Sequence, residues 1–153
     1  GVVFLLLGAS TVLGWYVTRS GIAREAAEMI IAVSTNPVVQ ILAVALLLLV
    51  LGMIVDVLPA IVIAAPVLTP AMVELGFDPL HFAMVMLLAL NIGNITPPVG
   101  MTLMTASKIA GVPYESVIRE SLPFLASHLV VLVIAALSPS LILWFPRLIG
   151  AAG

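Results

Sequence analysis

Long apolar stretches alternate with short polar intervals along the chain. The apolar stretches cover residues 2–17, 38–55, 60–73, 82–90 and 122–146. As a helix, residues 38–55 would extend about 27 Å, close to the roughly 30 Å thickness of the hydrocarbon core of a bilayer. The pattern predicts an all-α membrane protein built as a multi-span helical bundle. We expect residues 1–17 to be the end of one transmembrane helix and residues 122–146 to be the last crossing.

Two segments with more charge predict helices outside the hydrocarbon core. In residues 21–35, apolar side chains recur every three or four positions, and the charged side chains lie elsewhere on the helix. This amphipathic pattern indicates a helix that lies in the membrane interface. Residues 107–121 carry mixed charge and predict a surface helix that opens at Pro113.

Residues 38–73 form two apolar arms joined by a short link that contains Asp56 and Pro59. A four-residue turn with a carboxylate and no polar loop fits a re-entrant helical hairpin, whose tip ends inside the protein. An ordinary helical hairpin with Asp56 at the level of the lipid headgroups fits the same residues. The residues by themselves leave both alternatives open.

Residues 79–106 begin as an apolar helix but contain an interruption that reads NIGNITPPVG. Pro97 and Pro98 remove two backbone donors, and the glycines Gly93 and Gly100 give the backbone further freedom. Apolar sequence resumes at once with Met101 to Ala106. The pattern therefore predicts a transmembrane helix that is broken at membrane depth.

The interruption is the stretch most indicative of a binding site. Irregular backbone at membrane depth is tolerated only inside protein or around a water-filled cavity, because unpaired carbonyls facing lipid are costly. Freed carbonyls and the Thr96 hydroxyl are hard oxygen ligands that suit an alkali cation, and half-helix N-termini beside them suit an anion. The alternative is a kinked packing helix in which Asn91 and Asn94 form hydrogen bonds with neighbouring helices.

Composition narrows the function classes. Of the 153 residues, 63% are hydrophobic and 8% are charged, against about 25% charged in soluble domains. The net charge of −2 without a basic cluster excludes nucleic acid as a partner. The chain has no cysteine, and its histidines, His81 and His128, stand too far apart for a zinc site. We expect His128 to be a hydrogen-bonded packing residue. The sequence contains none of the residue arrangements that are typical of catalytic sites, so we do not expect an enzyme.

The chain resembles the C-terminal part of the large membrane subunit of tripartite ATP-independent periplasmic (TRAP) transporters, the DctM-like family. The resemblance runs over most of residues 20–146 and is carried by the segments GMIVDVLPAIVIAAPVLTP, GFDPLHF and NIGNITPPVGMTLMTASKIAGV. It implies one of two inverted repeats of an elevator-type, ion-transporter-like fold, each with a re-entrant hairpin and a broken helix. The chain is then expected to be the C-terminal fragment of a longer permease.

The resemblance also implies a function. It implies sodium-coupled secondary transport of small carboxylates, such as C4-dicarboxylates or sialic acids, across the bacterial inner membrane. Sodium is the implied coupling ion, without a bound cofactor. The implied partners are the N-terminal repeat of the same permease, a small DctQ-like membrane subunit, a periplasmic substrate-binding protein and the lipid bilayer. The alternative is a structural membrane module without a transport site. Such a module would have no need of a helix that is broken inside the bilayer.

Carried over to this sequence, the resemblance places the hairpin tip at residues 52–59 and the opening of the broken helix at residues 93–100. It implies that sodium is coordinated by the Thr96 hydroxyl and by backbone carbonyls at Gly93 and Gly52. Asp56 stands at a family motif position, where contact with sodium, contact with substrate and capping of a half-helix all stay open. The candidate substrate- and ion-binding residues are Gly52, Asp56, Pro59, Gly93, Asn94, Thr96, Pro97, Pro98 and Gly100.

Overall fold

The computed structural model describes residues 19–149 together with Gly8, Val12 and Tyr16. The expected transmembrane helix end at residues 1–17 therefore lies largely outside the described residues. All regular elements in the described part are α-helices, so the predicted all-α class is confirmed. They are α2 (Ile22–Val33), α3 (Pro37–Ile54), α4 (Val57–Glu74), α5 (Pro79–Asn94), α6 (Met101–Ala110), α7 (Tyr114–Leu137) and α8 (Pro139–Leu148).

Three of the described helices, α3, α4 and α7, are long and apolar enough to cross a membrane, and α5 is a shorter apolar helix. Local sequence explains where α3 and α5 begin. Asn36 and Asp78 accept hydrogen bonds from backbone N–H groups of the first turn, and each precedes a proline at the first helical position. Because that position needs no donor, the Asn-Pro and Asp-Pro pairs start these helices.

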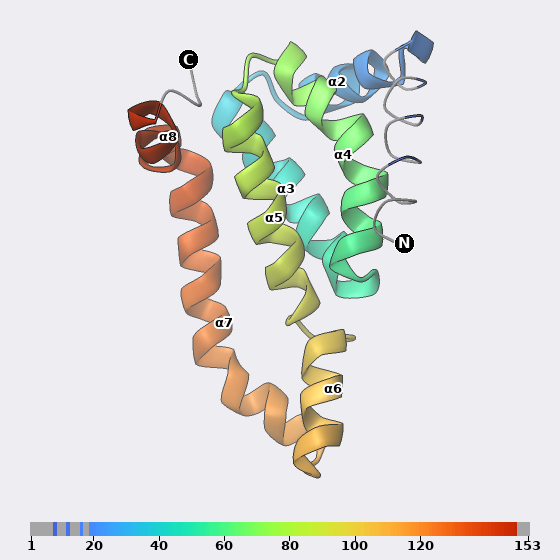
Figure 1. Cartoon of the computed structure of the whole chain (residues 1–153), viewed down its shortest axis with the longest axis vertical. Coiled ribbons are helices and arrows are strands. Elements are labelled where there is room, and N and C mark those ends of the chain that lie inside the picture. Colours follow the sequence, from blue (N-terminus) through green and yellow to red (C-terminus); the bar gives the residue numbers. More distant parts are fainter. Residues whose placement is uncertain (1–7, 9–11, 13–15, 17–18, 150–153) are drawn as a thin grey trace.

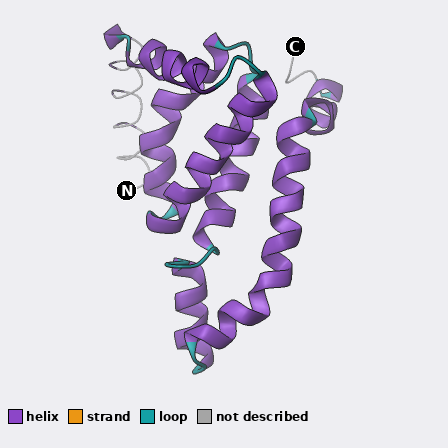
Figure 2. Cartoon of the chain, turned by 180° about the vertical axis from the view of Figure 1, so that it is seen from behind, coloured by secondary structure: helices purple, strands orange, loops and turns teal. Residues whose placement is uncertain are grey.

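The helices form a bundle in which α3 and α5 lie centrally, with α4 on one side and α7 on the other (Figure 1). α2 lies across one end, and α6 and the first half of α7 extend beyond the hairpin at the other end (Figure 2). The core lies where α3, α4 and α5 meet. Its fully buried side chains include Leu48, Ala60, Met72, Phe82, Val85, Ala89 and Leu90.

The hairpin link is shorter in the structure than in the sequence prediction. α3 ends at Ile54 and α4 begins at Val57, so two residues, Val55 and Asp56, join them in place of four. Pro59 belongs to the first turn of α4, where its missing N–H breaks no helical hydrogen bond. α3 and α4 leave the link toward the same end of the molecule, as both forms of hairpin require (Figure 1).

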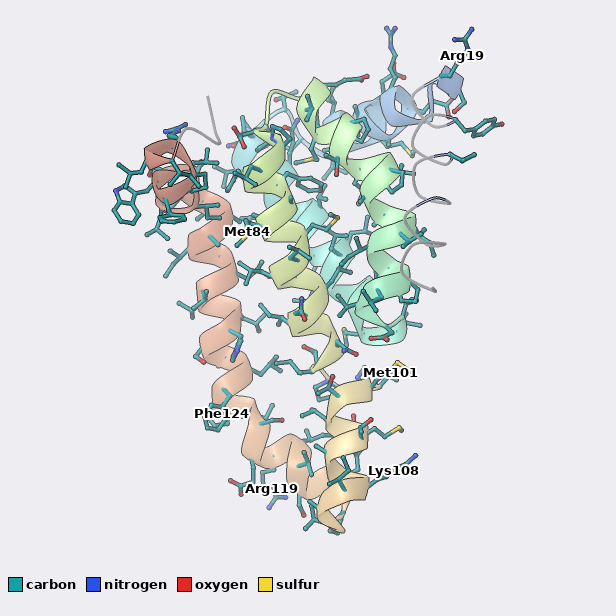
Figure 3. The ribbon with its side chains drawn as sticks, in the orientation of Figure 1. Arg19, Met84, Met101, Lys108, Arg119 and Phe124 are labelled. Carbon is teal, nitrogen blue, oxygen red and sulfur yellow. The ribbon has the colours of Figure 1, made fainter. Side chains whose placement is uncertain are left out.

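A loop of residues 95–100 separates α5 from α6 and lies close to the level of the hairpin link (Figures 1 and 2). The segment that the sequence places at residues 79–106 thus consists of two helices, and the second continues to Ala110. Met101, at the start of α6, points to the side of the molecule on which the hairpin lies (Figure 3).

The C-terminal part differs from the sequence prediction. In place of a surface helix at residues 107–121 and a separate crossing at residues 122–146, α7 is one helix that contains Pro123. It bends close to Phe124, the residue that follows Pro123 (Figure 3). A proline removes one hydrogen bond and bends a helix, and here α7 is held by its packing on α5 and α6. The expected crossing breaks instead at Ser138, because the residue before Pro139 is driven out of the helical region.

A buried histidine joins α5 to α7. His81 is 1% exposed, and its Nε2 lies 2.9 Å from the carbonyl oxygen of Ala135. That carbonyl would ordinarily accept a bond from the N–H four residues later, but this residue is Pro139. With the proton on Nε2, His81 supplies the donor that Pro139 lacks and holds α7 beside α5.

Candidate functional site

The close crossing of α3 and α5 brings the hairpin against the end of α5. Gly52 and Gly93 are both buried at this crossing. A Cβ atom on Gly52 would overlap the carbonyl oxygen of Leu90. A Cβ atom on Gly93 would overlap the carbonyl oxygen of Leu49 and lie 2.9 Å from the Cα of Gly52. Glycine at both positions is what lets the two backbones approach this closely.

Asp56 lies in the hairpin link and caps α4. Its carboxylate accepts a hydrogen bond of 2.8 Å from the backbone N–H of Val57. Capping is therefore the role seen in the described contacts, among the three that the sequence leaves open. An ionised carboxylate has about four lone-pair sites, so the cap leaves acceptor capacity for a cation.

The two prolines leave backbone oxygens at the end of α5 without their helical donors. In a continuous helix, the N–H groups of positions 97 and 98 would bind the carbonyls of Gly93 and Asn94. The Gly93 carbonyl accepts instead from the N–H of Thr96 at 2.8 Å. The Asn94 carbonyl receives no backbone hydrogen bond from the described residues, which makes it available to a ligand.

The Thr96 hydroxyl faces back onto the helix that precedes it. It donates a hydrogen bond of 2.5 Å to the carbonyl oxygen of Ile92, four residues earlier. Because this bond uses the only proton of the hydroxyl, the Thr96 oxygen keeps its lone pairs for accepting a bond or binding a cation.

The side chain of Asn94 connects the two halves of the broken helix. Its Nδ2 donates a hydrogen bond of 3.0 Å to the hydroxyl oxygen of Thr102 in α6. Its Oδ1 is buried and has no hydrogen-bond partner in the described part of the chain. Reversing the amide would leave the nitrogen unpartnered instead. A buried polar atom without a partner costs about 1–3 kcal/mol, so a ligand that satisfies it is favoured.

An open cavity of about 510 Å³ lies between the hairpin link and α6. Its lining consists of Asp56, Asn94, Met101, Thr102, Thr105, Ala106 and Ile109. The five α6 residues recur at helical spacing and share one face of that helix. Asp56 is the only charged residue among these lining residues, which otherwise supply hydroxyl and amide groups and apolar surface. Such a mixture is typical of a small-molecule site.

The structure brings some of the predicted site residues together and leaves one outside. Asp56 and Asn94 line the cavity directly, whereas Pro59 is exposed in the first turn of α4 and is not part of the lining. The other predicted residues form the α3–α5 crossing or the loop after α5, and they are Gly52, Gly93, Thr96, Pro97, Pro98 and Gly100.

Three polar residues near the loop were missed by the sequence prediction. Thr102 and Thr105 stand three residues apart directly after the interruption, and this spacing could have indicated a polar face of α6. Tyr114 donates a hydrogen bond of 2.8 Å to the carbonyl oxygen of Val99. Nothing in the sequence pattern indicates this contact, because it depends on how α7 folds back onto α6.

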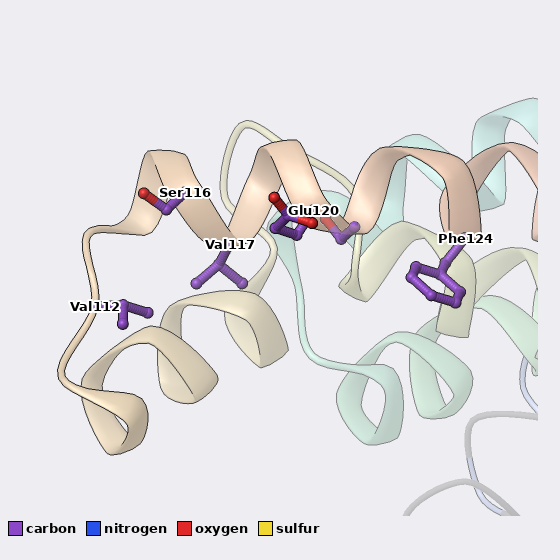
Figure 4. A pocket seen from close by; sticks show the side chains of 6 residues that line it. Val112, Ser116, Val117, Glu120 and Phe124 are labelled. Carbon is purple, nitrogen blue, oxygen red and sulfur yellow. The ribbon is translucent and has the colours of Figure 1, made fainter.

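A second cavity, of about 450 Å³, lies on the first half of α7 (Figure 4). It is lined by Val112, Ser116, Val117, Glu120, Ser121 and Phe124. None of the predicted site residues belongs to this lining. The candidate functional site is therefore the cavity between the hairpin link and α6.

Several known proteins that are similar to this chain are named as permease proteins of TRAP transporters. The family model described as the DctM component of tripartite ATP-independent periplasmic transporters matches residues 1–141. The chain is 36% identical over 147 residues to the sialic acid TRAP transporter large permease protein of Vibrio cholerae, covering 96% of the chain and 34% of that protein. It is 35% identical over 133 residues to the C4-dicarboxylate TRAP transporter large permease protein of Pseudomonas aeruginosa, covering 87% and 31%. It is 34% identical over 143 residues to the isethionate TRAP transporter permease protein of Oleidesulfovibrio alaskensis, covering 94% and 22%.

The chain spans about a third of the length of the first two of these relatives. All three relatives are named as permeases, and none of the three is named as an enzyme. Together with three apolar helices of membrane-spanning length, these similarities place the chain in an integral membrane protein.

Proposed function

The chain belongs to the DctM family of tripartite ATP-independent periplasmic transporters, and we propose that it forms the C-terminal repeat of a sodium-coupled permease for small carboxylates. The names of two relatives support this substrate class, because they specify sialic acid and C4-dicarboxylates. The third relative is named for isethionate, a small sulfonate anion. We infer a small organic anion with at least one carboxylate as the substrate.

The observation that carries the proposal is that the hairpin link and the broken helix meet at one cavity, which is lined by both polar and apolar side chains. In a membrane protein, irregular backbone of this kind lines cavities and pathways. A structural membrane module, the alternative, has no need of a helix end that leaves the Asn94 carbonyl and Asn94 Oδ1 without partners. Transport is therefore favoured over a scaffold.

The residues around the loop fit a sodium ion. In the proposed site, the ion is held by the Asn94 carbonyl, the Thr96 hydroxyl and the Gly93 carbonyl, with backbone of the hairpin near Gly52 completing the shell. These groups are hard oxygen ligands of the kind that alkali and alkaline-earth ions prefer. When bound, sodium supplies positive charge beside the cavity.

The charge of the cavity explains why an anion needs that cation. Asp56 is the only charged side chain in the described lining. A carboxylate within about 4 Å of it would be repelled by about 4 kcal/mol at an effective dielectric constant of about 20. Bound sodium offsets this repulsion, so substrate affinity depends on sodium, and this mutual dependence couples the two fluxes. The N-terminus of α6, which has no side-chain cap, and the hydroxyl of Thr102 offer donors to the anion.

Further subunits complete the proposed transporter. Carriers with inverted repeats bind their substrate between the repeats, so we propose that the N-terminal repeat closes the open side of the cavity. We also propose the bacterial inner membrane as the location. A DctQ-like small membrane subunit then acts as a second partner, and a periplasmic binding protein delivers the substrate.

The test is uptake by the whole permease that contains this chain, reconstituted into proteoliposomes with its small subunit and binding protein. Labelled sialic acid and labelled succinate are offered under an inward gradient of sodium or of potassium. The proposal predicts accumulation of one of these carboxylates under the sodium gradient and its loss when monensin collapses that gradient. Equal uptake in potassium would contradict sodium coupling. A folded complex that takes up neither anion would favour the structural module.

A further inference from the structure

The loop between α5 and α6 has few hydrogen bonds of its own. The backbone N–H groups of Ile95 and Thr96 bond to carbonyls upstream, at the end of α5. Pro97 and Pro98 have no N–H to donate. In the described residues, the second half of the loop is therefore not held by hydrogen bonds between its own backbone groups.

The side chain of Tyr114 reaches this second half from the start of α7. Its hydroxyl donates to the carbonyl oxygen of Val99 at 2.8 Å, and the carbonyl oxygen of Pro98 lies 3.3 Å away. The hydroxyl has one proton, so the Val99 bond is the stronger and Pro98 is a secondary acceptor. These are the side-chain hydrogen bonds that the structure describes for the loop's second half.

The turn between α6 and α7 fixes the position of Tyr114. Gly111 adopts a left-handed conformation, with φ of 67°, and ends α6. The buried Ser107 hydroxyl donates to the Val112 carbonyl at 2.7 Å, and the Val112 N–H bonds back to the Ser107 carbonyl at 3.3 Å. This pair of bonds across a left-handed glycine closes the turn firmly. Tyr114 follows directly as the first residue of α7 and has little freedom to move away from the loop.

Gly100 brings Tyr114 close to the proposed ion ligands. Gly100 is buried, with φ of 46°, and a Cβ atom on it would lie 3.3 Å from both the Thr96 carbonyl oxygen and the Tyr114 hydroxyl. The Tyr114 hydroxyl and the Thr96 carbonyl oxygen thus both lie beside Gly100. The Tyr114 contact is therefore made with the same loop that contains the proposed sodium ligand Thr96.

We propose that Tyr114 is a positioning residue for ion binding: its hydroxyl holds the Val99 carbonyl so that the loop keeps the conformation that binds sodium. The inference rests on the proposed sodium site. Without the hydroxyl, the loop populates the binding conformation less, and the apparent affinity for sodium falls by the same fraction. Tyr114 does not touch the ion, so transport at saturating sodium is preserved.

The test compares Tyr114→Phe with Tyr16→Phe in the reconstituted permease, since Tyr16 is 60% exposed. Uptake is measured across a series of sodium concentrations. Loss of one hydrogen bond predicts a rise of about threefold to tenfold in the sodium concentration for half-maximal uptake by Tyr114→Phe. Maximal uptake stays at the wild-type level, and Tyr16→Phe matches wild type at every sodium concentration.

A second measurement separates positioning from stability. The unfolding temperature of each purified variant is determined with sodium and with N-methylglucamine in its place. Positioning predicts that Tyr114→Phe loses part of the stabilisation that sodium gives. The inference would be overturned if Tyr114→Phe lowered the unfolding temperature equally in both buffers. The rise in unfolding temperature that sodium gives would then be the same as in wild type, and the Tyr114 contact would be merely structural.

Thr96→Val serves as the reference that separates the two proposals. If Thr96→Val shifts the sodium dependence and Tyr114→Phe does not, the sodium site stands and the role of Tyr114 is refuted. If neither variant shifts it, the sodium site itself is refuted, and the role of Tyr114 is refuted with it.

Discussion

Gly93 packs directly on Gly52 where α5 crosses α3, so close that a Cβ atom on Gly93 would lie 2.9 Å from the Cα of Gly52. The two residues belong to different candidate elements, the broken helix and the hairpin. Their contact sets the position of the hairpin link relative to the loop after α5. The cavity between the link and α6 depends on this relative position.

Gly93→Ala is therefore expected to destabilise the permease by about 1–3 kcal/mol, because the added methyl group must push two backbones apart. The apparent unfolding temperature of the purified protein measures this effect. Gly8→Ala is the control, since a Cβ atom on Gly8 meets nothing within 4 Å. Equal unfolding temperatures for Gly93→Ala and Gly8→Ala would show that the crossing is not tightly packed in solution.

Asp56 caps α4, and this role predicts a difference between two substitutions. Asparagine caps helices about as well as aspartate, whereas alanine costs about 1 kcal/mol. We expect Asp56→Asn to keep stability and to make uptake less dependent on sodium, because the charge that repels the anion is removed, and Asp56→Ala to lose stability. Asp78, which caps α5 through bonds to two backbone N–H groups, is the matched position. A higher sodium concentration for half-maximal uptake by Asp56→Asn, but not by Asp78→Asn, would instead assign the Asp56 carboxylate to the ion.

His81 supplies the donor that Pro139 denies to the Ala135 carbonyl. His81→Phe leaves that buried oxygen unpaired, and we expect a loss of about 1–3 kcal/mol in stability. The apparent unfolding temperature again provides the readout. His128→Phe is the control, because His128 is exposed and bonds within its own helix, to the Phe124 carbonyl. If the control variant were as unstable as His81→Phe, the hydrogen bond between His81 and Ala135 would make no specific contribution to stability.

The sequence predicted those features that depend on residues close together in the chain. The start of α5 follows from Asp78-Pro79, and the interruption follows from Pro97 and Pro98, which lack N–H groups. The family resemblance is confirmed by the match over residues 1–141.

Features that depend on distant packing were not predicted. The break at Pro139 is compensated by His81 from another helix, and the bend at Pro123 does not end α7. The bond from Tyr114 to Val99 joins residues 15 positions apart through a turn whose geometry no local pattern reveals. The re-entrant form of the hairpin, and with it the depth of Asp56 in the membrane, stays a prediction.

The central claim is that the loop after α5 binds the coupling ion, and Thr96 tests it most directly. Thr96→Val removes one oxygen at nearly constant shape, while Thr96→Ser keeps that oxygen. Thr69→Val, on α4 and outside the cavity lining, controls for the loss of a threonine hydroxyl.

The decisive measurement is uptake by the whole permease in proteoliposomes across a sodium series, at fixed substrate and binding protein. The account predicts that Thr96→Val raises the sodium concentration for half-maximal uptake severalfold, with Thr96→Ser and Thr69→Val close to wild type. An unchanged sodium dependence in Thr96→Val, at normal protein levels, would contradict the claim and leave the loop as a kink between two packed helices.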